Sequence, residues 1–165
     1  MNNETVSSTE CTTNAHDLTE AARLQAELSS QKSEPSAPLA GEVNSDDIPS
    51  VSIDEGAHKY VLVRASAPGS SETPSRVRTF VYSKQGASYH RNVAEYLLPI
   101  LQNAGYYDIR ITGGGRIVKD SKSKQINIFG YSYGFGAADH ELAVEVVEES
   151  GLYDGYTLNW SNDGY

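Results

Sequence analysis

The residues of this chain that could do chemistry begin with His90, at the start of a predicted helix. A strand-like run over residues 78–82 precedes it, Ser88 can cap the helix, and apolar residues follow at helical spacing. His90 stands three residues before Val93 on the same stripe, so its imidazole should point inward at the first turn, where amides and the helix dipole disfavour an imidazolium. A neutral histidine beside an anion site could accept a proton or act as a nucleophile. The alternative is a packed, hydrogen-bonded histidine.

Two glycine-rich segments could hold the anion. Residues 113–115 are three glycines followed by Arg116, whose planar guanidinium suits a phosphate group, although a wide hairpin turn with a surface arginine is equally compatible. Residues 132–136 lie between a strand and a helix, and their successive amides could form a concave anion site beside the hydroxyl of Ser132. The two glycines of the second segment also imitate the start of a dinucleotide fingerprint. No third glycine and no second mononucleotide half follow.

Lys59 is the charged residue of an otherwise apolar strand over residues 59–63. It shares a face with two valines of that strand, and it either faces the anion site or reaches solvent from the strand end. His140 begins the second helix beside the segment 132–136, in a structural or a supporting role. The histidines lack the spacing of a zinc site, and the single cysteine, Cys11, allows neither a disulfide nor a thiolate metal site.

Composition divides the chain near residue 48. All 15 aromatic residues lie from Tyr60 onward, and residues 1–47 carry nine acidic and two basic residues. Such a stretch has too little apolar surface to offset chain entropy, which predicts a disordered acidic tail. One helix is possible within it, because a capping box over residues 17–20 precedes an apolar stripe, but a helix that short needs a partner. The nearly neutral residues 48–165 form one domain.

The domain pattern predicts an α/β (α+β) fold with a mixed sheet. Strands are expected near 59–63, 76–82, 107–111, 116–118, 125–129 and 156–160, and helices over 89–102 and from about 138 to 150. No run is long enough for a signal peptide or a membrane span, and the acidic start argues against a mitochondrial leader. We therefore expect a cytoplasmic protein that does not bind membranes. A nearly neutral domain also argues against nucleic-acid binding.

Taken together, these segments resemble the phosphohistidine phosphatases of the Janus/Ocnus family. The resemblance runs from residue 48 to the last residue and covers the domain but not the tail. The segments that carry it are 58–64, 89–90, 113–117, 130–132 and 160–165. It implies a mixed sheet of about six strands with one α-helix packed on each face. It also implies a monomeric, metal-independent phosphatase without cofactors that acts on phosphohistidine-containing proteins and, in some members, on phospholysine.

Six positions match functional positions of the family. His90 matches the catalytic histidine. The positions implied to bind substrate are Lys59, Arg116, Ser132, Tyr133 and Gly134. Gly134 stands where the family has a small residue other than glycine.

The chemistry favours a clamp on the phosphoryl oxygens, since phosphoryl transfer depends mainly on positioning and charge stabilisation. His90 would then either take a proton from the attacking water, the route we favour, or attack phosphorus itself. Two other functions remain open from the residues: a phosphate- or phosphopeptide-binding module without turnover, and a small nucleotide-binding half-domain.

Overall fold

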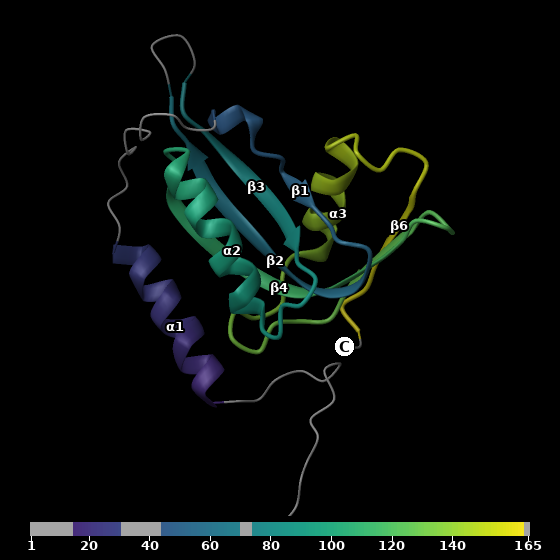
Figure 1. Cartoon of the computed structure of the whole chain (residues 1–165), viewed down its shortest axis with the longest axis horizontal. Helices are drawn as coiled ribbons and strands as arrows, with labels where there is room; N and C mark the ends of the chain where they lie inside the picture. Colours follow the sequence, from purple (N-terminus) through teal and green to yellow (C-terminus); the bar gives the residue numbers. More distant parts are fainter. Residues whose placement is uncertain (1–14, 31–43, 70–73, 164–165) are drawn as a thin grey trace, which may run out of the picture.

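We describe the protein from a computed structural model, which covers residues 15–30, 44–69 and 74–163. Its centre is a six-stranded sheet with the strand order β1-β3-β2-β4-β5-β6 (Figure 1). The strands are β1 (Val51–Ser52), β2 (Gly56–Ala67), β3 (Arg76–Ser83), β4 (Tyr107–Asp120), β5 (Gln125–Phe129) and β6 (Thr157–Trp160). The helices are α1 (Ala15–Ser30), α2 (His90–Asn103) and α3 (His140–Glu149), with a 3₁₀ turn, η1, over Ser45–Asp47.

The sheet is mixed, as the sequence predicts. The long strand β2 pairs antiparallel with both β3 and β4, and β4 pairs antiparallel with β5. The two outer pairs, β1 with β3 and β5 with β6, are parallel. The expectation of a mixed α+β sheet of about six strands is therefore confirmed.

Alternation along the central strand places a core on each face of the sheet. In β2, Val61 and Val63 face α2, whereas Tyr60 and Leu62 face α3. Side chains at successive strand positions point to opposite faces, so a strand buried on both sides is apolar at every position. Lys59 shares the face of Val61, which places it on the side of α2.

Residues 113–115 do not form the predicted loop between two strands. They lie inside β4, which runs without a break from Tyr107 to Asp120. A side chain at Gly114 would collide with neighbours, because a Cβ there would lie 2.7 Å from the carbonyl oxygen of Tyr60. Glycine is therefore required at this point by close packing rather than by a turn.

The described part of residues 1–47 also differs from the predicted disorder. Residues 15–30 form α1, which lies beside α2 on the same side of the sheet (Figure 1). The apolar stripe of the capping-box segment finds its partner there: Ala21 and Leu28 are buried and Leu24 packs against the α2-side core. Residues 1–14 and 31–43 lie outside the described residues. Among those described, no helix has the length and apolar character needed to cross a membrane.

Candidate active site

His90 is the first residue of α2 and is buried. The helix cap is Tyr89 rather than the predicted Ser88: the Asn92 side chain accepts a hydrogen bond from the Tyr89 amide at 3.0 Å, and the Asn92 amide donates to the Tyr89 carbonyl. This reciprocal capping fixes the first turn and with it the direction of the imidazole.

The imidazole is held by the strand that carries the glycines. Its Nε2–H donates to the carbonyl oxygen of Gly115 at 2.8 Å. Since a carbonyl can only accept, Nε2 carries the proton, and the lone pair of the neutral ring is on Nδ1. Burial, together with the charges of Lys59 and Arg116, lowers the pKa of His90 to about 4, against the opposing effect of the Gly115 bond. The ring is neutral at physiological pH.

Lys59 and Arg116 are direct cross-strand partners in the β2–β4 pair. Directly paired residues share a face of the sheet, so both lie on the α2 side with Val61, and both positive charges lower the His90 pKa. Like charges opposite each other on a sheet repel, an arrangement that an anion between them would relieve. Lys59 is buried, whereas Arg116 is partly exposed.

Gly114 brings the imidazole and the loop after β5 together. A Cβ on Gly114 would lie 2.9 Å from Cδ2 of His90 and 3.1 Å from Cβ of Ser132. Because Gly114 has no side chain, α2 and the loop 132–136 can both pack closely against β4 at this point. The three segments are far apart in the sequence, and this glycine is the point at which they converge.

The loop over residues 132–136 is not the open row of amides that the sequence suggests. It closes on itself: Ser132 and Gly136 exchange backbone hydrogen bonds of 3.1 and 2.8 Å, and the Phe135 amide donates to Oγ of Ser132 at 3.1 Å. The amides of Ser132, Phe135 and Gly136 donate within the loop in this way. The amides of Tyr133 and Gly134 do not take part in these bonds. Ser132 is buried with its hydroxyl hydrogen available to donate, whereas the Tyr133 side chain is exposed.

A second histidine supports the strand that holds His90. His140 Nε2–H donates to the Gly130 carbonyl at 2.7 Å, and the Tyr60 hydroxyl donates to His140 Nδ1 at 2.5 Å. Both ring nitrogens are engaged, and Tyr60 belongs to the core on the α3 side of the sheet, the face opposite His90. A Cβ on Gly115 would meet both rings, at 2.8 and 3.0 Å. Tyr60 and His140 thus pack against β4 at Gly115, the residue whose carbonyl orients His90.

Sequence reasoning missed a buried ion pair at the same place. The Asp17 carboxylate of α1 accepts from Nε of Arg91 at 2.9 Å, and both side chains are largely buried. Arg91 directly follows His90. The capping box at residues 17–20 indicated the helix, but no local pattern showed where it would dock.

The sequence of the domain matches one known protein family. A model of the Janus/Ocnus family matches residues 45–157. The chain belongs to the Janus/Ocnus family. Its match covers β1 to β5, α2 and α3, and leaves α1 outside.

Several relatives of this Janus/Ocnus chain carry functional names. The 14 kDa phosphohistidine phosphatase of Homo sapiens is 37% identical over 120 residues, which are 72% of this chain and 94% of the relative. The protein of the same name from Sus scrofa is 34% identical over 129 residues, 77% of this chain and 100% of the relative. The sex-regulated protein janus-A of Drosophila pseudoobscura pseudoobscura is 29% identical over 119 residues, 72% of this chain and 78% of the relative.

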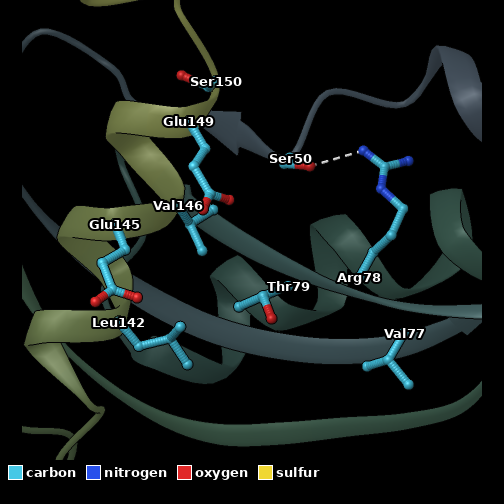
Figure 2. Close-up of a pocket in the computed structure, with 9 residues that line it drawn as sticks. All are labelled: Ser50, Val77, Arg78, Thr79, Leu142, Glu145, Val146, Glu149 and Ser150. Atoms are coloured by element: carbon cyan, nitrogen blue, oxygen red, sulfur yellow. Dashed lines mark hydrogen bonds between the residues drawn. The ribbon is translucent and has the colours of Figure 1, made fainter.

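The Janus/Ocnus chain also has a hollow away from His90, on the face of the sheet that α3 covers (Figure 2). Its volume is about 350 Å³. Glu145 and Glu149 of α3 line one side, and Val77 of β3 lies across from them, whereas the Arg78 guanidinium is turned to Ser50. The sheet separates this hollow from His90, so it is not part of the site.

Proposed function

We propose that this chain is a protein histidine phosphatase that hydrolyses the P–N bond of phosphohistidine. The observation that carries the proposal is the neutral His90, with its lone pair on Nδ1 and two cations beside it, in a family whose relatives include proteins named phosphohistidine phosphatase. A phosphoryl group is an anion, so the two cations attract it. The imidazole is uncharged and can therefore act as a base or as a nucleophile. We further propose a cytoplasmic monomer that needs no metal ion.

Binding of the phosphoryl group is assigned to the groups that converge at Gly114. Lys59 and Arg116 supply charge from β2 and β4. The Ser132 oxygen accepts a hydrogen bond from the Phe135 amide, a bond that does not use the hydroxyl hydrogen, so the hydroxyl can donate to the phosphoryl group. The Tyr133 and Gly134 amides complete the set, since the other amides of the loop bond within it. Charge-assisted hydrogen bonds of this kind are the strong ones.

Two routes lead from this complex to free phosphate. In the first, Nδ1 of His90 takes a proton from water while the water oxygen bonds to phosphorus, and the P–N electron pair leaves on the substrate imidazole, which takes up a proton. In the second, Nδ1 bonds to phosphorus while the substrate P–N bond breaks, and the leaving imidazole takes up a proton. Water then breaks the new P–N bond on His90, which releases phosphate and restores Nδ1. Both depend on an unprotonated Nδ1. We favour the first.

One experiment tests the function and separates the routes. Wild-type protein and the His90→Ala variant are incubated with a ³²P-labelled phosphohistidine protein, and released phosphate is measured. Rapid acid-free quenching followed by peptide mapping then looks for label on the peptide that contains His90. Release by wild type alone supports the proposal, and labelled His90 selects direct attack. Saturable binding without release, unchanged in the variant, would instead indicate a phosphate-binding module.

A further inference from the structure

Helix α1 is an addition to the domain that the family shares. The family match begins at residue 45, after α1 ends at Ser30. The whole length of the relative from Sus scrofa aligns with 77% of this chain, so part of the chain has no counterpart in that relative. The role of α1 must therefore be found in what the helix contacts here.

One contact of α1 is with the loop of the site. Ala21 is buried, and its Cβ would lie 2.7 Å from a Cβ placed on Gly134. Two Cβ atoms cannot approach that closely, so the helix can pack here only because residue 134 is glycine. The loop segment to which we assign phosphate binding is thus the surface on which α1 rests.

A second contact is with the start of α2. Asp17 is buried against Arg91, with 2.9 Å between the carboxylate and Nε. Arg91 directly follows His90 in the first turn of α2, and its guanidinium also lies 3.9 Å from the Glu95 carboxylate. The carboxylate of α1 therefore occupies an arginine that could otherwise attract an anionic substrate.

The far half of α1 holds the helix in place. Gln25 donates from Nε2 to the carbonyl of Ile111 at 2.9 Å, two residues before the glycines of β4, and Leu28 enters the α2-side core. The helix thus spans from β4 to the first turn of α2, in line with its position beside α2 in Figure 1.

With α1 docked against Gly134 and Arg91, three of the groups to which we assign the chemistry are buried. The exposed fraction is 3% for His90, 6% for Lys59 and 2% for Ser132. A phosphohistidine on the surface of another protein must bring its phosphorus to the imidazole, and groups this buried do not admit it. The docked helix is small and a 16-residue helix is marginal on its own, so its release costs little relative to unfolding of the domain.

We propose that α1 is a displaceable cover over the His90 site, held by the Asp17–Arg91 ion pair and the Ala21–Gly134 contact, and that a protein substrate reacts only when this helix has moved away. The proposal rests on the proposed function, whose regulation it names. Loosening either contact should increase the population of the open state and raise turnover.

The test uses the full chain with two opening variants and a matched control for each. Asp17→Asn removes the charge that pairs with Arg91, and Glu27→Gln removes a charge from the exposed side of the same helix. Ala21→Leu adds bulk against Gly134, and Ala22→Leu adds the same bulk at the neighbouring exposed position. Circular dichroism and thermal unfolding establish that each variant keeps its fold.

The first readout is kcat/KM with a phosphohistidine protein. We expect it to rise about fivefold or more in both opening variants, the range of a typical allosteric coupling, and to stay at the wild-type value in both controls. The second readout does not depend on turnover: the rate at which diethyl pyrocarbonate modifies His90, followed by peptide mass spectrometry. It should rise in the same two variants.

Each pattern of results decides between the possibilities. Unchanged modification rates in the opening variants would refute the proposed cover, because α1 would then have no effect on access to His90. A lower kcat/KM in both variants would also refute it, because α1 would then help to bind the substrate. Faster modification of His90 with no phosphate release by any protein would uphold the cover and refute the phosphatase. Failure of the two proposals is thus distinguishable.

Discussion

The Nε2 atom of His90 lies 2.8 Å from the carbonyl oxygen of Gly115, and this bond decides which ring nitrogen carries the proton. A carbonyl accepts and never donates, so Nδ1 is left with its lone pair. The acceptor sits on a strand and the imidazole on the first turn of a helix, and 25 positions separate them in the chain. The reactive nitrogen is therefore selected by the fold.

Replacing His90 by Gln should abolish activity while sparing the fold. The Gln amide can donate to the Gly115 carbonyl in place of Nε2, but it has no basic nitrogen. We expect kcat/KM to fall by about 10²–10⁴-fold, the usual contribution of a positioned base, in a phosphate-release assay. His90→Ala should be equally inactive and less stable by about 1–3 kcal/mol, because the Gly115 carbonyl is then buried without its donor. A Gln variant with wild-type turnover would remove His90 from the mechanism.

The pH dependence of stability should carry the signature of a buried neutral histidine. The pKa of His90 is lowered from 6.5 to about 4 in the folded protein. Above pH 6.5 neither state binds a proton there, whereas between pH 6.5 and pH 4 the unfolded chain binds one and the folded protein does not. The free energy of unfolding therefore falls as pH falls through this window, by about 3 kcal/mol in all.

Urea unfolding at pH 7 and pH 4.5 measures this effect. The His90→Gln variant is the control, since it should lose the His90 part of the pH dependence. An equal pH dependence in wild type and variant would show that His90 ionises as readily in the folded state as in the unfolded state. For the same reason the acid limb of kcat/KM, corrected for spontaneous P–N hydrolysis, should lie near pH 4 rather than near pH 6.5.

Lys59→Ala should weaken substrate binding more than turnover. The buried ammonium faces the site from β2, and loss of a charge-assisted hydrogen bond should raise KM by about tenfold or more. Lys59→Arg keeps the charge and should recover part of the loss. Initial rates over a range of phosphohistidine protein concentrations separate the two constants. A change in kcat alone, with KM constant, would argue against a binding role.

Gly114→Ala should disturb the site through packing. The added Cβ would lie within 3.1 Å of the Tyr60 carbonyl oxygen, the His90 ring and the Ser132 side chain. We therefore expect the free energy of unfolding to fall by about 1–3 kcal/mol and kcat/KM to fall strongly. Gly86→Ala is the matched control. Its surroundings are open and its φ is +83°, so it should cost stability through backbone strain without changing kcat/KM. Equal activity losses in the two variants would contradict a specific role for Gly114.

Chelation should leave activity intact. The proposed chemistry relies on Lys59, Arg116 and backbone donors to stabilise charge, and it assigns no step to a metal ion. Phosphate release should be the same before and after dialysis against EDTA. Activity lost on dialysis and recovered with a divalent cation would refute this part of the proposal.

Sequence reasoning reached the strands and helices of the domain because their signals are local. The apolar run of β2, the spacing of Val93 and Leu97 in α2, and the polar turn between β4 and β5 each follow from nearest neighbours. It failed for residues 113–115, where three glycines predict a loop. Their real cause is the crowding of Tyr60, His90 and the 137–138 backbone against the strand, and none of these is near in the chain.

The sequence by itself determined that a histidine would stand in the first turn of a helix, that a lysine would share a strand face with two valines, and that two glycine-rich segments would follow. Periodicity and capping are properties of a few consecutive residues, so they can be read locally. Only the tertiary structure decided that Gly115 orients the imidazole, that Gly114 lies against His90 and Ser132, and that α1 docks on Gly134 and Arg91. Each of these depends on contacts between remote segments, and their energies come from close packing and burial that no short stretch of sequence contains.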